Sequence, residues 1–310
     1  MQFLAGVGAA GRESVAGYFG GGFSTVYISG IDKIAFPADT KTILSATLSA
    51  GTSELAGMSN SGVAGYYGGG GTVALGANTK IEKLAFPAET ISTLSATLTI
   101  GVGYFAGMAN YGVAGYFAGG LDVVGNKLSG IDKIAFPAET KTTLSATLSA
   151  ARWQTAAMAD SSVAGYVGGG IEAARVNTIQ KVAFPADTVT TLSATLTSGR
   201  TTDGMADSGV AGYFGGGSTP TPINSIDKIT FPADTKTTLS ATLTNIGYGR
   251  GAFADTGIAG YFGGGFDSST STRHNGIDKI AFPSDTKSTL SGTLTNQSYF
   301  LTGFADCGVF

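Results

Sequence analysis

Acidic and amide side chains recur at two fixed places in this sequence, and their oxygen atoms could bind a hard cation such as Ca²⁺. The first set comprises Asn60, Asn110, Asp160, Asp207, Asp255 and Asp306, and the second comprises Asp39, Glu89, Glu139, Asp187, Asp234 and Asp285. Asp and Asn also hydrogen-bond to their own backbone in tight turns, and we favour that role for the first set. For the second set we expect solvated turn carboxylates. We therefore predict no metal site and no cofactor.

The residue types in this sequence give little indication of a catalytic site. Glycoside hydrolysis needs two carboxylic acids in unequal environments, whereas the acids here have near-copies in other repeats. His274 is the only histidine, and a lone histidine in a loop supplies neither a triad nor a zinc site. Glycine triplets such as Gly20–Gly22 are not followed by Lys-Ser or Lys-Thr, so they do not indicate a phosphate loop. We predict that the protein is not an enzyme.

Aromatic and basic side chains gather in the segments that differ most between repeats. The candidate binding residues are Tyr27, Tyr104, Phe105, Trp153, Arg175, Tyr248, Arg250, His274, Tyr299 and Phe300. Such side chains on loops above a rigid scaffold suit a binding surface for a protein partner or for sugar rings. The alternative is that these loops diverged after duplication and that some of the aromatic rings cap the core.

The elements that must position these residues belong to an internal repeat. The phrase Val15–Gly22 (Val-Ala-Gly-Tyr-Phe-Gly-Gly-Gly) returns five times, and the Gly of its Gly-Tyr pair recurs every 47 to 50 residues. Two more phrases follow it in each unit, Ile-Asp-Lys-Ile-Ala-Phe-Pro at Ile31–Pro37 and Leu-Ser-Ala-Thr-Leu at Leu44–Leu48. A fixed period near 50 residues indicates a repeat architecture.

Each unit has the pattern of four short strands. In the second unit the first strand is Ala56–Asn60, and a Ser-Gly turn leads to the Val-Ala-Gly-Tyr strand. The third strand, Ile31–Phe36 in the first unit, alternates as a strand should and is ended by Pro37. The fourth is expected around Leu44–Leu48. Four-stranded units at this spacing predict an all-β protein, a six-bladed β-propeller.

The ends of the chain indicate how the ring closes. The first unit lacks a first strand, and the C-terminus supplies a spare one, Thr302–Asp306. We expect one propeller domain over residues 1–310, with Met1–Glu13 as a strap over the closure. The predicted blades are 15–55 with 302–310, 56–105, 106–155, 156–202, 203–250 and 251–301.

The antiparallel topology divides the loops between two faces. Turns within the strand pairs one–two and three–four share the constant face, where the repeats agree closely. The variable face holds the second-to-third loops and the blade-to-blade links. Those segments are Phe23–Gly30, Gly71–Lys80, Leu121–Gly130, Ile171–Thr178, Ser218–Ser225, Phe266–Gly276, Thr99–Phe105, Arg152–Thr155, Thr244–Arg250 and Thr295–Leu301.

Three further residue roles follow from the repeat. The six copies of Phe36 are expected in the core, where each contributes roughly 1.5–3 kcal/mol. Lys33 and its copies are expected to pair with the adjacent blade, because Asp32 and Lys33 point to opposite faces of their strand. Cys307 is expected to be a small buried residue.

These phrases resemble the kelch repeat over nearly the whole chain. The resemblance rests on the Tyr-Phe-Gly-Gly stretch, the Ile-Asp-Lys-Ile-Ala-Phe stretch, and an Arg after the fourth strand at Arg152 and Arg200. Leu44 and its copies stand where that family has a Trp in the fourth strand, and only two units carry the Arg. The resemblance implies kelch-like blades more firmly than any activity. Gly-rich chains with nearly identical repeats also look similar to bacteriophage tail-fibre or head-decoration propellers.

Composition narrows the partners. A net charge of −3 with 18 Lys and Arg residues argues against nucleic acid. No run of 18 apolar residues occurs, the start lacks the pattern of a secretory signal, and the single cysteine excludes an internal disulfide.

We therefore expect a non-enzymatic structural and binding module of a phage virion. Its predicted partners are other virion subunits and a host surface protein or glycan, without membrane insertion. The alternatives are a lectin or sugar-active enzyme on the same scaffold, and a cytoplasmic kelch-type adaptor.

Overall fold

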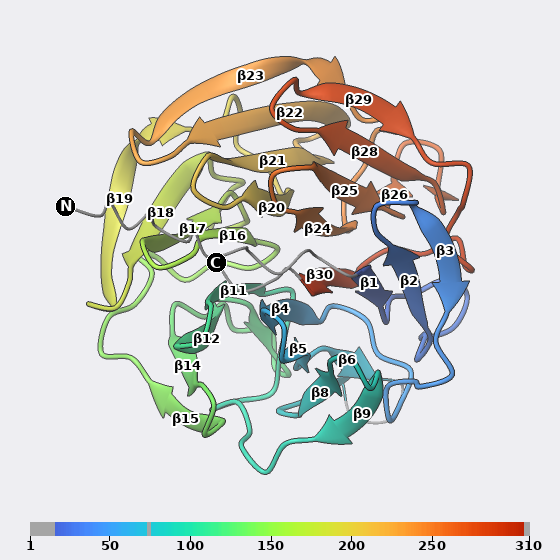
Figure 1. Ribbon diagram of the computed structural model, residues 1–310. Helices are drawn as coiled ribbons and strands as arrows, with labels where there is room; N and C mark the ends of the chain where they lie inside the picture. The colour runs from blue at the N-terminus through green and yellow to red at the C-terminus, as the bar shows by residue number, and fades with distance from the viewer. Residues whose placement is uncertain (1–15, 73–75, 307–310) are drawn as a thin grey trace, which may run out of the picture.

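The protein is an all-β, six-bladed β-propeller, as the repeat predicts. The structure is a computed structural model that describes residues 16–72 and 76–306. Six sheets of four antiparallel strands surround a central axis, and the chain runs through them in order (Figure 1). Blade 1 combines the two ends of the described chain, and blades 2 to 6 follow along the sequence.

The strands take the same four positions in every blade, counted from the axis outward. The innermost strands of blades 1 to 6 are β30 (Thr302–Asp306), β4 (Ala56–Asn60), β11 (Ala106–Asn110), β16 (Ala156–Asp160), β20 (Asp203–Asp207) and β24 (Gly251–Asp255). The second strands are β1 (Ala16–Gly20), β5 (Ala64–Gly68), β12 (Ala114–Ala118), β17 (Ala164–Gly168), β21 (Ala211–Ser218) and β25 (Ala259–Gly263). The third strands are β2 (Ile31–Ala35), β8 (Ile81–Ala85), β14 (Ile131–Ala135), β18 (Thr178–Ala183), β22 (Pro222–Thr230) and β28 (Ile277–Ala281). The outermost are β3 (Thr40–Ile43), β9 (Thr90–Thr93), β15 (Thr140–Thr143), β19 (Thr188–Thr195), β23 (Thr235–Thr242) and β29 (Thr286–Thr289).

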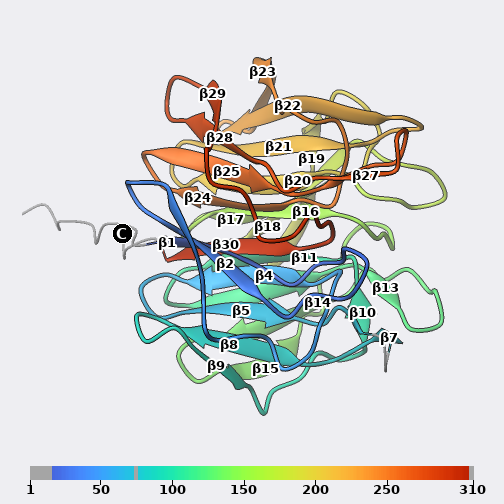
Figure 2. The same cartoon turned by 90° about the vertical axis from the view of Figure 1, so that its right-hand side faces the viewer.

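Short two-residue strands lie in the loops on one side of the propeller. They are β6 (Gly71–Thr72), β7 (Gly76–Ala77), β10 (Val102–Gly103), β13 (Leu121–Asp122), β26 (Phe266–Asp267) and β27 (Thr272–Arg273). Figure 2 shows β7, β10, β13 and β27 on the right-hand side of the disc, which is the variable face.

Ring closure follows the prediction. Strand β30 pairs antiparallel with β1, so that Ala16 lies opposite Asp306 and Gly20 opposite Thr302. The red C-terminal strand therefore lies beside the blue N-terminal strand in Figure 1. The predicted strap Met1–Glu13 and Cys307 lie outside the described residues.

The fourth strand begins four residues earlier than predicted. The turn after the third strand is tight, since Ala35 pairs with Thr40, and the outer strand of blade 1 is Thr40–Ile43 rather than Leu44–Leu48. The Leu-Ser-Ala-Thr-Leu phrase still follows the third strand, because the Leu44 and Leu48 amides donate to the carbonyls of Ile31 and Ser29. Both leucines are buried. In blades 1, 2, 3 and 6 the phrase therefore covers the core rather than forming the regular ladder, whereas in blades 4 and 5 its first four residues belong to β19 and β23.

The core lies between blades, because both faces of each sheet are covered by a neighbour. Ile31 and Ile34 point to opposite faces of β2, yet both are buried, one against blade 2 and the other against blade 6. The predicted core phenylalanines stack on the Tyr of the preceding blade. The stacked pairs are Tyr18–Phe86, Tyr66–Phe136, Tyr116–Phe184, Tyr166–Phe231, Tyr213–Phe282 and Tyr261–Phe36.

An ion pair at the constant face joins every blade to the next, which confirms the predicted role of Lys33 and its copies. The pairs are Lys33–Glu89, Lys83–Glu139, Lys133–Asp187, Lys181–Asp234, Lys228–Asp285 and Lys279–Asp39, with N–O distances of 2.5–2.7 Å. The stacked Tyr donates its hydroxyl hydrogen bond to the same carboxylate, as Tyr116 does to Asp187 at 2.8 Å. The expectation that these carboxylates are merely solvated is therefore wrong, because the neighbouring blade brings a cation and a hydroxyl to each turn.

The Asn and Asp residues that end the innermost strands also act between blades. We expected them to cap their own turns, but Asn60 accepts a hydrogen bond from the Gly112 amide of the next blade at 2.9 Å. Asp160 accepts one from Gly209 in the same way, at 2.8 Å. Asn110, Asp207 and Asp306 likewise accept amide hydrogen bonds from Ser162, Gly257 and Gly62 of the next blade.

A third connection links the outer parts of the blades. A Ser or Thr follows each Leu-Ser-Ala-Thr-Leu phrase, and its backbone amide donates to a side chain in the third strand of the next blade. The acceptor is the acid or amide that follows the first Ile of the Ile-Asp-Lys-Ile phrase or of its copies. The pairs are Ser49–Glu82, Thr99–Asp132, Ser149–Gln180, Thr197–Asp227, Thr244–Asp278 and Thr295–Asp32. The shorter Ser stands opposite the longer Glu or Gln, so the side chains compensate each other in length.

Candidate functional site

Eight aromatic side chains form a continuous belt on the variable face. Its members are Tyr27, Phe23, Tyr299, Phe266, Tyr248, Phe300, Tyr104 and Trp153. Neighbouring ring centroids lie 4.5–6.0 Å apart, within the range of favourable aromatic contacts. All eight side chains are half-buried, so the structure brings together six of the ten predicted site residues in one surface that still reaches solvent.

A cation lies over one part of this belt. The Arg273 guanidinium is 5.8 Å from the Phe23 ring, 5.9 Å from Phe266 and 5.7 Å from Tyr299. Such contacts are favourable because the aromatic face is negative. Phe23, Phe266 and Arg273 were not among the predicted site residues, although all three lie in second-to-third loops of the variable face.

The other four predicted residues have different environments. Phe105 is buried in the core beneath the belt, and Arg250 is also buried. Arg175 is exposed, and its guanidinium lies 3.4 Å from the Ser218 hydroxyl. His274 is half-buried, and burial followed by the charge of Arg250 lowers its pKa. These four residues therefore do not belong to the aromatic belt.

Three rings of the belt, Tyr104, Tyr248 and Phe300, line a cavity on the propeller axis. The cavity has a volume of about 140 Å³, and the innermost strands form its wall. Its floor carries only Gly or Ala at the second position of each innermost strand. These residues are Gly57, Gly107, Ala157, Gly204, Ala252 and Gly303. A separate hollow of about 90 Å³ lies beyond this floor toward the constant face and is lined by Met58, Met108, Met158, Met205, Phe253 and Phe304 among others.

Five residues of the blade-to-blade links form a rim around the cavity mouth. The rim is Gly249, Phe300, Glu54, Tyr104 and Gln154, joined by successive backbone hydrogen bonds of 2.7–3.0 Å. All five adopt positive φ, between 52° and 72°. For the four that are not glycine this conformation is strained, and such strain is often found at binding sites.

The rim is open at blade 5. The link into this blade is one residue shorter than the others, because Leu196 and Asp203 are seven positions apart whereas Leu148 and Ala156 are eight apart. Thr201 makes the own-blade hydrogen bond to the Ser218 carbonyl that Ser53, Trp153 and Tyr248 make in their blades, and the residue that would follow it in the rim is absent. One missing residue thus leaves a gap in an otherwise closed ring.

Asp203 lines the cavity at this gap. It begins the innermost strand of blade 5, where the other blades have Ala56, Ala106, Ala156, Gly251 and Thr302. Its Oδ1 accepts a hydrogen bond from the Arg250 amide at 3.1 Å, while its Oδ2 is buried without a hydrogen-bond partner and lies 3.7 Å from Arg250 Nη1. Burial raises the pKa of Asp203 to about 6, although Arg250 acts in the opposite direction.

Glu54 is a second unlike acid on the cavity wall. It belongs to the rim of blade 2, across the axis from blade 5, and its counterparts are Tyr104, Gln154, Gly249 and Phe300. Burial raises the pKa of Glu54, while hydrogen bonds from Tyr104 and Ser53 act to lower it. The expectation that every acid has near-copies is therefore wrong for Glu54 and Asp203. Aligning the repeats at their leucines would have exposed both, because each replaces an uncharged residue.

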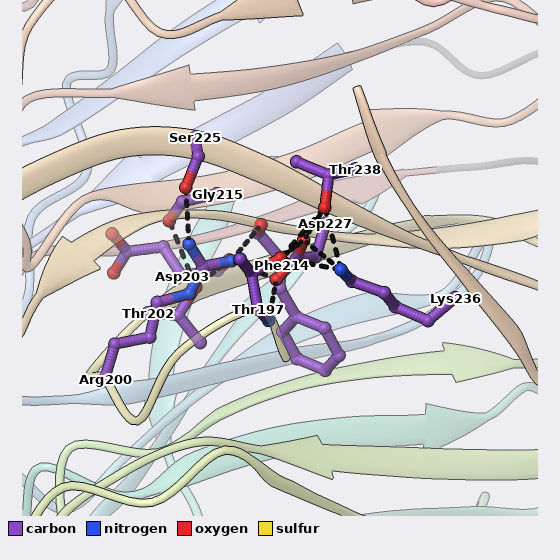
Figure 3. Close-up of polar contacts among 10 residues, drawn as sticks. All are labelled: Thr197, Arg200, Thr202, Asp203, Phe214, Gly215, Ser225, Asp227, Lys236 and Thr238. Atoms are coloured by element: carbon purple, nitrogen blue, oxygen red, sulfur yellow. Dashed lines mark hydrogen bonds and ion pairs between the residues drawn. The ribbon is translucent and has the colours of Figure 1, made fainter. Parts of the chain in front are cut away.

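The electrostatics of Asp203 extend into blade 5 through Arg200. Figure 3 shows the fully buried Arg200 guanidinium bonded to Ser225, to the Phe214 carbonyl and, at 3.0 Å, to Asp227. Lys236 reaches the other oxygen of Asp227 at 3.3 Å. Because Arg200 also interacts electrostatically with Asp203, alternating charges run from the outer strand of blade 5 to the cavity.

The cavity wall keeps two buried polar atoms that have no hydrogen-bond partner in the described residues. They are Asp203 Oδ2 and Thr155 Oγ1, and Thr155 is 7% exposed. A buried polar atom left unpaired costs roughly 1–3 kcal/mol. Among the residues described, no group of three or more His, Cys, Asp or Glu side chains could hold a metal ion. The described part of the chain also includes no helix long and apolar enough to cross a bilayer.

No protein-family model matches the chain, and no curated protein matches it significantly.

Proposed function

We propose that the protein is a non-enzymatic binding module that recognises a glycan through the aromatic belt of its variable face. The observation that carries this proposal is the unbroken contact of eight half-buried rings, three of which line a cavity. The apolar C–H face of a sugar ring packs well against an aromatic face, and aromatic and Arg side chains dominate binding energy in many interfaces. A fold of this kind alone would not specify a ligand.

We further propose that the constant face docks the module onto an assembly, such as a phage particle that presents the variable face to a host cell. Support comes from a ring of exposed aliphatic side chains on the constant face. They are Val63, Val113, Val163, Val210 and Ile258, each 43–51% exposed. The likeness of the Gly-rich repeats to phage propellers favours a virion as that assembly.

The test is binding of the purified protein to intact bacterial cells and to a glycan array, with Trp153→Ala and Tyr104→Ala variants. Each variant removes one ring of the belt. We expect each to weaken binding about tenfold or more, corresponding to about 1.4 kcal/mol, without unfolding the protein.

A matched control is Tyr111→Ala, which removes a Tyr at the constant face, in the turn between β11 and β12. Binding should survive this change within twofold. Equal loss in all three variants, or binding to neither cells nor glycans, would contradict the proposal. Binding to cells that persists after their surface glycans are removed would identify a protein receptor instead.

A sugar-hydrolysing enzyme is a second candidate, favoured by one observation. Glu54 and Asp203 are unlike acids that line one cavity from opposite blades, and burial raises the pKa of both. Pairs of acids in unequal environments are what glycoside hydrolysis requires. Release of reducing ends from oligosaccharides, abolished by Glu54→Gln, would establish this function. No release from sugars that the protein binds would exclude it for those sugars.

A further inference from the structure

The axial cavity combines three features that the other hollow near the axis lacks. It lies at the gap in the rim at blade 5, it is lined by three rings of the belt, and it has two buried polar atoms without a hydrogen-bond partner. The hollow toward the constant face is lined instead mainly by Met, Ala and Phe. A ligand group is therefore expected at the variable-face end of the axis.

Both acids of the cavity already interact with groups of the protein. Asp203 lies beside Arg250, and the Tyr104 hydroxyl hydrogen-bonds to Glu54. A charged ligand would have to give up its hydration to enter the cavity, which is costly. A neutral hydroxyl group loses much less, and it could donate to Asp203 Oδ2 and form a hydrogen bond with Thr155 Oγ1.

The size of the cavity limits what enters it. Its volume of about 140 Å³ is below the roughly 300–1,000 Å³ of most sites for drug-sized ligands. The side chains of Tyr104, Tyr248 and Phe300 line the same cavity and supply an apolar wall. A single ring with hydroxyl groups on its edge and an apolar face matches this lining.

We propose that the axial cavity binds one neutral sugar residue, whose hydroxyl groups hydrogen-bond to Asp203 and Thr155. The proposal rests on the glycan-binding function above and deepens it: the belt contacts the chain of the glycan, and the cavity takes one residue of it. The shortened link into blade 5 places Asp203 and the gap in the rim beside this cavity.

The test uses free monosaccharides as probes, in saturation-transfer NMR and calorimetric titrations of the whole protein. The neutral probes are glucose, galactose, mannose, rhamnose and N-acetylglucosamine, and the charged probes are glucosamine and galacturonic acid. We expect saturable binding of at least one neutral sugar. Thr155→Val and Asp203→Asn, which keep the side-chain shapes, should each weaken it at least tenfold. The charged probes should bind at least tenfold more weakly than that sugar.

The control is Ser59→Ala, which removes a hydroxyl at the opposite hollow and should change the affinity less than twofold. Thermal unfolding of each variant shows whether it is folded, and Thr155→Val keeps the test decisive if Asp203→Asn does not fold. If glycan arrays bind but no monosaccharide does, or if a charged sugar binds best, the cavity proposal is overturned while the belt proposal stands. Binding to neither cells nor glycans overturns both.

Discussion

Asp203 is the residue at which one blade becomes chemically different from the other five. Its carboxylate lies among uncharged counterparts at the axis, and two arginines, Arg250 and Arg200, supply the positive charge around it. A buried pair of this kind contributes little net stability, because the cost of removing both charges from water offsets their attraction. A role in binding explains its presence better than a role in holding the fold.

The pH dependence of stability should report on this residue. Burial raises the pKa of Asp203 from 3.8 to about 6, so the folded protein holds this proton more tightly than the unfolded chain. Asp203 then contributes stability that is complete below about pH 4 and is lost as the pH rises to about 6. We compare the free energy of unfolding of the wild type with that of the Asp203→Asn variant. The value for the wild type minus the value for the variant should fall by on the order of 2–3 kcal/mol between pH 4 and 7. Denaturant unfolding at four pH values tests this, and a constant difference would contradict it.

At the scale of the elements, neighbouring blades pack through a glycine and a large side chain. The Gly of each Gly-Tyr pair faces the third residue of the preceding blade's innermost strand. That residue is Met opposite Gly115, Gly165, Gly212 and Gly260, and Phe opposite Gly17 and Gly65. A Cβ atom at any of these glycines would overlap the facing side chain, so the absence of a side chain is what lets the sheets approach.

The two kinds of contact should respond differently to an added methyl group. Gly65→Ala meets the rigid ring of Phe304, whereas Gly165→Ala meets the sulfur of Met108, which can move. We expect Gly65→Ala to cost roughly 1–3 kcal/mol and Gly165→Ala clearly less. The double change Gly65→Ala with Phe304→Met should recover part of the loss. Thermal unfolding measures all three, and equal losses without recovery would show that the facing side chain does not set the cost.

At the scale of the whole molecule, stability depends on closing the ring. Strand β30 supplies the inner edge of blade 1 and packs against both β24 and β4. Without it, β1 would expose a free strand edge at the axis, and two blades would lose the core that they share with it. Closure therefore couples the last strand to the first blade, which makes the propeller one cooperative unit.

Truncation tests this coupling. A chain ending at Leu301 should form aggregates or an expanded species in size-exclusion chromatography and lose its sharp unfolding transition. A chain ending at Asp306 keeps β30 and should behave as the full-length protein does. A compact, cooperative monomer ending at Leu301 would show that the ring does not need its closing strand.

The sequence by itself determined the architecture, because the same strand-forming phrases recur in six units. The spacing of the phrases was sufficient to predict six blades, the innermost strands to the residue, closure by Thr302–Asp306, and the inter-blade pairing of Lys33. Alternation and turn residues are local signals, and a β-propeller is built mainly from local strand pairing. The start of the outer strand was misplaced because the leucine phrase follows that strand in four blades, whereas in blades 4 and 5 the strand begins before the phrase and includes its first four residues.

Only the tertiary structure decided which groups meet at the axis. Glu54, Tyr104, Gln154, Gly249 and Phe300 are far apart in the sequence and become hydrogen-bonded neighbours only because six links converge on one point. The belt likewise needs loops of blades 1 and 6 and the links into four blades to lie side by side. The absence of one residue before Asp203 is a small change in a sequence, but in a closed ring it cannot be absorbed elsewhere and leaves a gap.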